Sequence, residues 1–361
     1  MRAISPNSLV VCAAAGAVIL FAGNARAQVA LDPHFPLHIA SASFQTDSDR
    51  VGNLLDGAIG RDGRICAADF SEKMIHCLVR NPDHWVEIGR NGEGPGEFRA
   101  PYRVAFTPSQ AMWVWDFQSQ QLSHFDAAGH FTGRAALPYF FRQVDNMVAL
   151  GEDRVVFCGV TSIASPARDS ALHLFKWVGS GTPMQLVRAF GRLPAYSVRE
   201  KIDHWGAGVV TVAANGNLYY TRRVPWDISE FRLDGTLVRV IPGPETLIMG
   251  ADSAVSITED KETVTIRRNP DATIVYPLRA IDIGQNWILT GRRIATPKEA
   301  HVVWDLLDRR TGRRIAETPL PKPLTEISGF GYDATRNTLW ASGSRDDVDG
   351  IWSVTFARTP Q

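Results

Sequence analysis

The sequence lacks the features that mark membrane, nucleic-acid-binding and zinc-binding proteins. After residue 27 no apolar run approaches the ~18 residues that a membrane-spanning helix needs. Lys plus Arg and Asp plus Glu each number 38, and this balance provides no basic face for nucleic acid. Neither an HExxH motif nor a Cys-x-x-Cys motif occurs, which argues against zinc. We therefore expect no nucleic-acid partner, and no transmembrane segment after signal removal.

Helical periodicity and hydrolase motifs are missing as well. Apolar residues almost nowhere recur at the spacing i, i+3, i+4, i+7 that indicates an amphipathic helix. The nucleophile motif Gly-x-Ser-x-Gly is absent, which disfavours a serine triad on this chain. An all-β protein without a recognisable nucleophile is the expectation.

The first 27 residues have the form of an export signal. Arg2 supplies a positive start, Leu9 to Ala22 form a short apolar core, and Ala25-Arg26-Ala27 is a small-x-small cleavage site. We expect cleavage before Gln28 and a mature periplasmic or secreted chain, with residues 28–361 as one domain. A signal that stays uncleaved and acts as an anchor is the alternative.

Three cysteines remain after the signal, and two of them have the spacing of a hairpin pair. If residues 64–69 and 74–80 form two strands joined by a turn, Asp69 faces Met74 and Cys66 faces Cys77. Directly opposed cysteines lie within disulfide reach, and an exported chain meets an oxidising compartment. The sequence predicts a Cys66–Cys77 disulfide, with two buried thiols as the alternative.

A repeated hairpin organises the chain. The segments 63–82, 110–129 and 216–235 superpose without gaps, so that Ile65, Met112 and Leu218 correspond. Each segment reads as a strand, a turn of about four residues and a second strand. Adding one strand before and one after gives six units near the ranges 54–89, 102–137, 144–191, 205–241, 279–320 and 327–356.

Units of this length with four short strands predict a six-bladed β-propeller of four-stranded antiparallel blades. We expect residues 35–44 to supply a strand that closes the ring with the last unit, and residues 242–277 to form a long insertion. The tryptophans are expected to pack between neighbouring sheets.

The second unit carries a family resemblance. The segment from Gly89 to Phe98, then Trp113-Val114-Trp115-Asp116 and Phe125-Asp126, resembles the NHL-type repeat of six-bladed β-propellers. Units one and four share this spacing, so the resemblance covers about half of the chain. Unit four departs from it with Arg222 in place of aspartate. For Asp69 and Asp116, at equivalent strand ends, capping of the following turn is favoured over ligand binding.

Loop length predicts where a ligand binds. Connections between second and third strands, and between blades, emerge on one face of a propeller, and the long ones here are 159–170, 192–204, 242–277, 291–300 and 343–350. Binding residues accumulate on long loops of a rigid scaffold. We expect this long-loop face to bind a small molecule, glycan, peptide or protein partner without a cofactor, through Arg222, Arg223, Trp226, Arg292, Arg293, Arg345 and His204.

An enzyme is the alternative. Calcium-dependent lactonases and some lyases of similar six-bladed shape hold a divalent cation near the axis. Oxygen-bearing residues fall in or beside the expected inner strands, and under this alternative Asp56, Asp145, Asn146 and Asp282 would bind calcium or another divalent cation. Convergence of these oxygens on one axial point would favour the enzyme, and a plugged channel would favour the binding protein.

Overall fold

Short strands rich in β-branched and aromatic residues, separated by tight turns, fold as antiparallel hairpins along the whole chain. The computed structural model describes residues 27–29, 37–46, 51–80, 83–162, 164–193, 207–222, 226–242, 255–259, 264–268, 274–283, 285–296, 298–319, 327–333, 338–345 and 348–358. Within these residues there is no helix of the length and apolarity that crossing a membrane requires. The expected signal segment lies outside them, except for Ala27.

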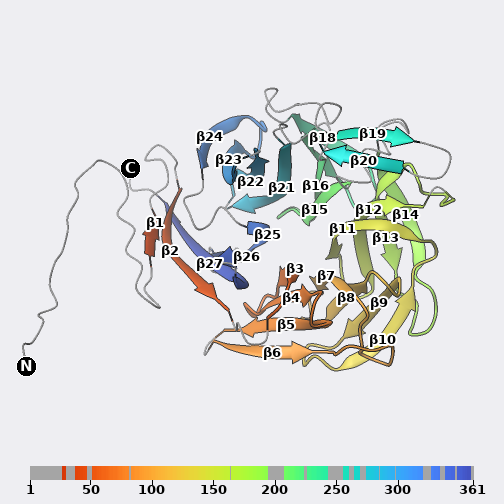
Figure 1. The fold of residues 1–361 in the computed structure, drawn as a ribbon. Helices are drawn as coiled ribbons and strands as arrows, with labels where there is room; N and C mark the ends of the chain where they lie inside the picture. Colours follow the sequence, from red (N-terminus) through yellow and green to blue (C-terminus); the bar gives the residue numbers. More distant parts are fainter. Residues whose placement is uncertain are drawn as a thin grey trace, which may run out of the picture.

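Six four-stranded antiparallel sheets surround a central axis, which confirms the expected six-bladed propeller (Figure 1). In order from the axis outward, blade 1 contains β3 (Leu54–Ile59), β4 (Ile65–Asp69), β5 (Met74–Val79) and β6 (His84–Ile88); blade 2 contains β7 (Pro101–Phe106), β8 (Met112–Asp116), β9 (Gln121–Phe125) and β10 (Phe131–Ala136); blade 3 contains β11 (Phe141–Ala149), β12 (Arg154–Thr161), β13 (Ser170–Lys176) and β14 (Gln185–Arg192). Blade 4 contains β15 (Gly208–Val212), β16 (Leu218–Arg222), β17 (Asp227–Phe231) and β18 (Leu237–Pro242); blade 5 contains β21 (Ile274–Ile283), β22 (Trp287–Ala295), β23 (Ala300–Asp308) and β24 (Arg314–Pro319).

The sixth blade joins the two ends of the chain. It contains β25 (Ile327–Asp333), β26 (Thr338–Arg345), β27 (Val348–Arg358) and, as its outer strand, β2 (Leu37–Gln45). The β2–β27 register runs from Leu37 opposite Arg358 to Gln45 opposite Ile351, as the expected closing strand requires. A short strand β1 (Ala27–Val29) adds to the outer edge of β2.

Two of the expected long loops are instead strand. The pairing of β22 with β23 continues to Ala295 opposite Ala300, and that of β26 with β27 continues to Arg345 opposite Val348. The expectation of irregular loops at 291–300 and 343–350 was therefore wrong, because these residues extend the hairpins of blades 5 and 6. The expected insertion 242–277 contains a separate hairpin of β19 (Val255–Glu259) and β20 (Val264–Arg268).

Large aromatic side chains fill the space between blades. Trp113, Trp304, Trp340 and Tyr219 are at most 1 % exposed, and each such burial contributes on the order of 2 to 3 kcal/mol of hydrophobic stabilisation. The apolar clusters bridge neighbouring blades; one of them joins Cys66 and Ile75 of blade 1 to residues of blade 2. The expected tryptophan packing is therefore observed at these positions.

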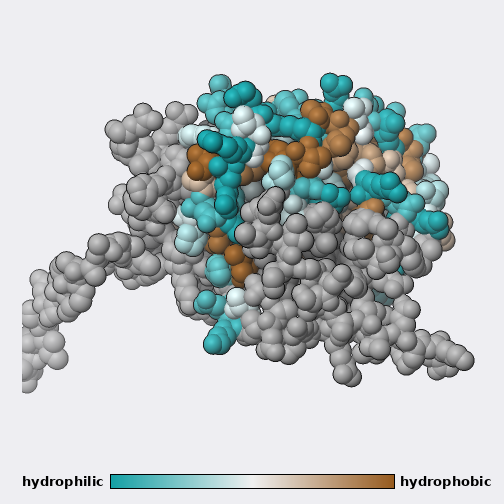
Figure 2. Space-filling view, turned by 90° about the horizontal axis from the view of Figure 1, so that it is seen from above, coloured by the Kyte–Doolittle hydropathy of each residue, from teal (hydrophilic) through white to brown (hydrophobic). Residues whose placement is uncertain are grey.

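The outer rim is less uniformly polar. On β18 the side chains of Leu237, Val238 and Val240 are 44 to 50 % exposed, and Ile315 on β24 is 46 % exposed. Seen from above, the described surface shows hydrophobic side chains among hydrophilic ones (Figure 2).

The predicted disulfide is present. Cys66 on β4 and Cys77 on β5 are directly opposed in the strand register and form a disulfide. Cys158 is a buried free thiol.

Two aspartates fasten the crossovers between blades to the turns beside them. The Asp69 carboxylate accepts hydrogen bonds from the backbone N–H groups of Gly52 and Asn53 in the entering crossover, at 2.6 and 3.1 Å, and from two N–H groups of the next turn. Asp116 does the same for the crossover into blade 2, where its donors include the N–H of Arg99 at 2.6 Å and that of Ser119 at 2.9 Å. This arrangement confirms the capping interpretation.

The glycine-rich segment after β6 is such a crossover. At Gly89 φ is +82°, and a Cβ there would lie 2.3 Å from the ring of Phe98, which is fully buried. Glycine is thus required by both backbone conformation and space. The segment is a packed connection, as the sequence indicated.

Candidate functional site

The inner strands share an irregularity close to their first residues, where the crossovers enter. A β-bulge or equivalent register shift interrupts β3, β7, β11, β21 and β25 at this level. A bulge re-aims the side chain of its extra residue, and bulges are common next to functional sites. Since crossovers emerge on the long-loop face, the bulges lie near the ends of the inner strands on that face.

Charged residues in or beside these bulges meet at the axis. Arg279, in the bulge of β21, donates a hydrogen bond from Nη2 to Oδ1 of Asp56, in the bulge of β3. Arg103, at the edge of the β7 bulge, has its Nε 3.8 Å from Oδ2 of the same aspartate. Blade 6 lies between blades 5 and 1 in the ring, so the contact between Arg279 and Asp56 passes the inner strand of blade 6. We call Asp56, Arg103 and Arg279 the axial mouth cluster.

The axial mouth cluster has one more positive than negative charge. Its side chains are 10 to 13 % exposed, so all three are largely withdrawn from water while remaining reachable. Electrostatic interactions are stronger in such an environment than at a fully hydrated surface. The three side chains therefore interact strongly with one another.

One buried polar atom of this cluster has no hydrogen-bond partner. Oδ2 of Asp56 is buried and accepts no hydrogen bond. Arg103 donates from Nε to the carbonyl oxygen of Val144 at 3.1 Å and from Nη1 to that of Tyr102 at 2.9 Å, whereas no partner of its Nη2 is found in the described part of the chain. Buried polar groups without partners carry a free-energy cost and are candidates for ligand contacts.

The other residues considered for an axial metal hold neighbouring blades together. Asn146 on β11 exchanges two hydrogen bonds with the backbone of Val210 on β15, at 2.7 and 2.8 Å. Asp145 accepts hydrogen bonds from the N–H groups of Ala207 and Gly208. Both side chains thus fasten blade 3 to blade 4.

Asp282 lies toward the opposite end of its strand. It follows Arg279 by three residues, about 10 Å along β21, so it lies beyond the level of the bulges. Among the residues that the structure describes, no group of three or more His, Cys, Asp or Glu side chains is arranged to hold a metal ion. Asp56, Asp145, Asn146 and Asp282 all have protein partners, and their binding of a cation stays a prediction.

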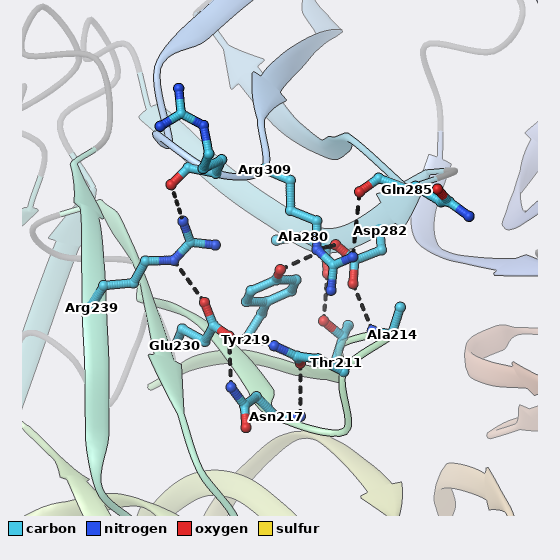
Figure 3. A network of polar contacts seen from close by, with 12 residues as sticks. Thr211, Ala214, Asn217, Tyr219, Glu230, Arg239, Ala280, Asp282, Gln285 and Arg309 are labelled. Carbon is cyan, nitrogen blue, oxygen red and sulfur yellow. Dashed lines mark hydrogen bonds and ion pairs between the residues drawn. The ribbon is translucent and has the colours of Figure 1, made fainter.

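A polar network around Asp282 closes the short-loop face between blades 4 and 5 (Figure 3). Asp282 accepts hydrogen bonds from the N–H of Ala214 at 2.6 Å and the hydroxyl of Tyr219 at 3.1 Å, and Nε of Arg309 lies 3.2 Å away. Burial, together with the charge of Asp282, raises the pKa of Tyr219 to about 12. The network has few unmet hydrogen-bonding groups, and its contacts join blade to blade.

Two of the predicted cationic residues of the long-loop face form ion pairs with acidic side chains. Arg292 is buried and donates to both carboxylate oxygens of Asp305, at 2.7 and 3.1 Å, and to Glu317 at 2.6 Å. Arg222 on β16 donates to Asp227, which lies directly opposite it on β17. For both residues the structure supplies intramolecular acidic partners.

The remaining predicted binding residues are only partly described. Nε of Arg293 and Nε1 of Trp226 are buried and have no hydrogen-bond partner. Arg223, His204 and the side chain of Arg345 lie outside the described residues. Their part in binding stays a prediction.

A small cleft lies beneath the glycine-rich crossover of blade 2. It measures ≈ 270 Å³ and is lined by Gly92, Glu93, Glu97, Arg99, Asp116, Gln118, Ser119, Gln121 and Arg134. Its charges are largely matched: Arg134 donates to Gln121 and to the carbonyl oxygen of Glu93, and Glu97 accepts from Arg90 and the N–H of Gly94. The charged groups that line the cleft therefore already have hydrogen-bond partners within the protein.

Sequence reasoning found Asp56 but missed Arg103 and Arg279. All three lie at the level of the bulges, and each bulge is one extra residue in an otherwise regular inner strand. An alignment of the inner strands that allows gaps would have shown the extra residue at a similar position in these strands.

The comparisons with known proteins support the architecture. No protein-family model matches the chain. The search of curated proteins likewise produced no match. Solved structures similar to this chain include a member of the DUF4221 family from Bacteroides vulgatus, with a TM-score of 0.58, 8% identity and coverage of 90% of this chain and 98% of that chain. A protein of Bacteroides fragilis described as exported has a TM-score of 0.55, 12% identity and coverage of 90% and 96%.

An enzyme also shares the architecture. Virginiamycin B lyase from Staphylococcus aureus has a TM-score of 0.52 and 12% identity, with coverage of 87% of this chain and 99% of that chain. At these identities the likeness shows the fold alone, because propellers host unrelated functions. The chain is a six-bladed β-propeller whose fold is similar to that of a protein described as exported and to that of an enzyme.

Proposed function

We propose that this protein is an exported, non-catalytic binding protein that holds a small ligand at the axial mouth of its long-loop face. The observation that carries the proposal is the axial mouth cluster: three charged side chains from blades 1, 2 and 5 meet at the channel mouth with hydrogen-bonding capacity left over. Ligand sites commonly combine a rigid scaffold with a few converging polar groups. Export and the NHL-type classification of the repeat are parts of this proposal that rest on the sequence.

The alternative of a divalent-metal-dependent lyase or lactonase fits the described residues less well. Asp56 faces two guanidinium groups, whose positive charge opposes a cation at the same point. Asp145, Asn146 and Asp282 are engaged in contacts between blades. These contacts favour a binding protein over a metal enzyme.

A thermal-shift screen tests the proposal. The chain starting at Gln28 would be melted with sugars, organic acids, amino acids and dipeptides, since a ligand that binds only the folded state raises the melting temperature. Hydrogen–deuterium exchange would then locate each stabilising compound. Protection near the first residues of the inner strands is the expected result. Protection confined to the short-loop face, or no stabilising compound at all, would contradict the proposal.

A further inference from the structure

We propose that the short-loop end of blades 4 and 5 attaches the protein to a membrane surface rich in anionic phospholipid. The inference is independent of the ligand site at the axial mouth and assigns a partner to the opposite face of the propeller. It is carried by arginines without ion pairs that lie beside exposed aliphatic side chains in the turns from β17 to β18, residues 232–236, and from β23 to β24, residues 309–313. We call these two turns, together with Arg188 on β14, the basic corner.

The turn from β23 to β24 concentrates arginine. Residues 308–314 read Asp-Arg-Arg-Thr-Gly-Arg-Arg. Arg310 and Arg313 are exposed, and among the described residues neither side chain has a hydrogen bond or ion pair. Arg232, in the neighbouring turn, is exposed and has no such partner within the described part of the chain either. Guanidinium groups in this state are available to an external phosphate or carboxylate.

Contacts between blades hold these arginines at one end of the molecule. Nη1 of Arg239 on β18 donates to the carbonyl oxygen of Arg310 at 2.9 Å, so the turn from β23 to β24 lies against blade 4. Arg188 on β14 donates to the carbonyl oxygen of Asp234, so blade 3 lies against the turn from β17 to β18. Both turns join the third and fourth strands of their blades and emerge on the short-loop face. The basic corner is therefore one continuous surface across the outer strands of three blades.

The charges of the basic corner do not cancel. The neighbouring arginines that lie deeper are matched by acids: Arg239 by Glu230 (Figure 3), Arg309 by Asp282, and Arg292 and Arg314 by Asp305 and Glu317. The charged groups left over are Arg188, Arg232, Arg310 and Arg313, and the turn acids Asp234 and Asp308. Both of these carboxylates also accept hydrogen bonds within their own turns. Four arginines against two acids leave two positive charges in excess.

Exposed aliphatic side chains lie among these arginines. The N–H of Gly235 donates to the carbonyl oxygen of Arg232, which places Leu233 at the tip of the turn, where it is 40 % exposed. Leu237 begins β18 directly after this turn and is 50 % exposed, and Ile315 on β24 is 46 % exposed. The rim of blades 4 and 5 lies at the top of Figure 1 and faces the viewer in Figure 2, where hydrophobic side chains lie directly beside hydrophilic ones.

Charge and exposed aliphatic groups together fit an anionic bilayer better than a soluble polyanion. Guanidinium groups bind phosphate oxygens through paired hydrogen bonds, and aliphatic side chains that enter the headgroup region gain by leaving water. A soluble acidic polysaccharide would engage the arginines but would give the aliphatic side chains no apolar contact. Because the crossovers emerge at the opposite ends of the strands, attachment at the basic corner would leave the axial mouth open to solvent.

Vesicle co-sedimentation tests the attachment. The chain starting at Gln28 would be mixed with vesicles of phosphatidylcholine alone and with vesicles of equal parts phosphatidylcholine and phosphatidylglycerol. The export segment must be absent, because its apolar core from Leu9 to Ala22 would itself bind lipid. We expect binding to the anionic vesicles to be at least about tenfold tighter than to the neutral ones. This preference should disappear in ~1 M salt, where the Debye length is about 3 Å.

Matched charge variants locate the contact. Arg310→Gln combined with Arg313→Gln should weaken binding to the anionic vesicles about twentyfold, since each arginine near such a surface contributes about fivefold. Arg90→Gln combined with Arg99→Gln removes the same charge from two exposed arginines of the blade 2 crossover, on the opposite face, and should leave binding unchanged.

Matched apolar variants test the contribution of the aliphatic side chains. Leu233→Asn should weaken binding to the anionic vesicles about fivefold, because its side chain would no longer leave water for the lipid interface. Phe140→Asn alters a side chain that is 52 % exposed in the crossover from blade 2 to blade 3, on the long-loop face, and should have no effect.

Three results would overturn the inference. One is equal binding to neutral and anionic vesicles, or binding to neither. Another is undiminished vesicle binding by the variant with Arg310→Gln and Arg313→Gln. The third is binding to an acidic polysaccharide, polygalacturonate, that is tighter than vesicle binding and is unchanged in Leu233→Asn, since this would identify a soluble polyanion as the partner.

Discussion

Replacing Arg292 by methionine tests whether this arginine of the long-loop face serves ligand binding or holds blade 5 together. The side chain is 8 % exposed and makes three hydrogen bonds, two to Asp305 and one to Glu317. Methionine retains much of the apolar stem but none of the charge. We therefore expect the substitution to act on stability.

The magnitude follows from the carboxylate that is left behind. Asp305 is fully buried, and after the substitution only Arg314, 3.5 Å away and 45 % exposed, would still face it. Removing one partner of a buried ion pair typically costs about 3 to 5 kcal/mol. At roughly 2 °C per kcal/mol for a domain of this size, the melting temperature should fall by about 6 to 10 °C.

The pH dependence should identify the cause. Burial raises the pKa of the Asp305 carboxyl even with Arg292 present, and loss of the arginine should raise it further. An acid whose folded-state pKa exceeds its unfolded-state value favours the folded state at low pH, and this contribution is lost as pH rises through the folded-state pKa. The deficit of Arg292→Met should therefore shrink as pH falls from about 7 to about 5.

Thermal and urea unfolding of the wild type, Arg292→Met and the double variant Arg292→Met with Asp305→Leu would measure these effects. The double variant should recover most of the loss, because no buried charge remains. Arg99→Met is the matched control, since Arg99 is 46 % exposed and its partner Glu93 is 69 % exposed; its loss should stay near or below about 1 kcal/mol. An Arg292→Met protein that melts with the wild type would refute this reasoning.

Three further measurements check other parts of the structure. Reduction of the Cys66–Cys77 disulfide, which closes a loop with a sequence separation of 11, should add two daltons to the intact mass and lower stability by about 3 kcal/mol; an unchanged mass would disprove the bond in solution. Burial opposes ionisation of Asp69, but His76 and backbone N–H groups outweigh it and lower the pKa, so this stability contribution is complete above about pH 4 and is lost as pH falls through the folded-state pKa. Asp69→Asn should flatten the acid side of the stability profile, and an equally steep profile would contradict the capping role. Calcium, magnesium, manganese, zinc and chelator should leave the melting temperature unchanged, whereas a concentration-dependent rise with one ion would restore the metal enzyme.

The propeller architecture could be predicted from the local sequence pattern, because each hairpin is encoded in about 20 consecutive residues. The opposition of Cys66 and Cys77, and the equivalence of Asp69 and Asp116, follow from turn position and period-two alternation alone. The closing strand could be expected for the same reason, since one unit lacked its fourth strand. These features depend on neighbours in sequence.

The axial mouth cluster depends on long-range geometry. Asp56 and Arg279 are 223 positions apart, and they meet only because bulges re-aim both side chains toward the axis. The partners of Arg292 were hidden for a related reason. Val303 on β23 lies opposite Arg292, and Asp305 is the next residue but one along β23, so the ion pair runs diagonally between the two strands. A single sequence records neither a bulge nor the length of a strand extension directly.

The pairing of β2 with β27 has a mechanical consequence. In this antiparallel pair Leu37 lies opposite Arg358, so a force that pulls the two ends of the chain apart loads one end of the strand pair. The hydrogen bonds between the strands would then break one after another, as in a zipper, and not all at once in shear. Stretching from the termini should open the ring at blade 6 first and leave the other five blades to unravel in turn.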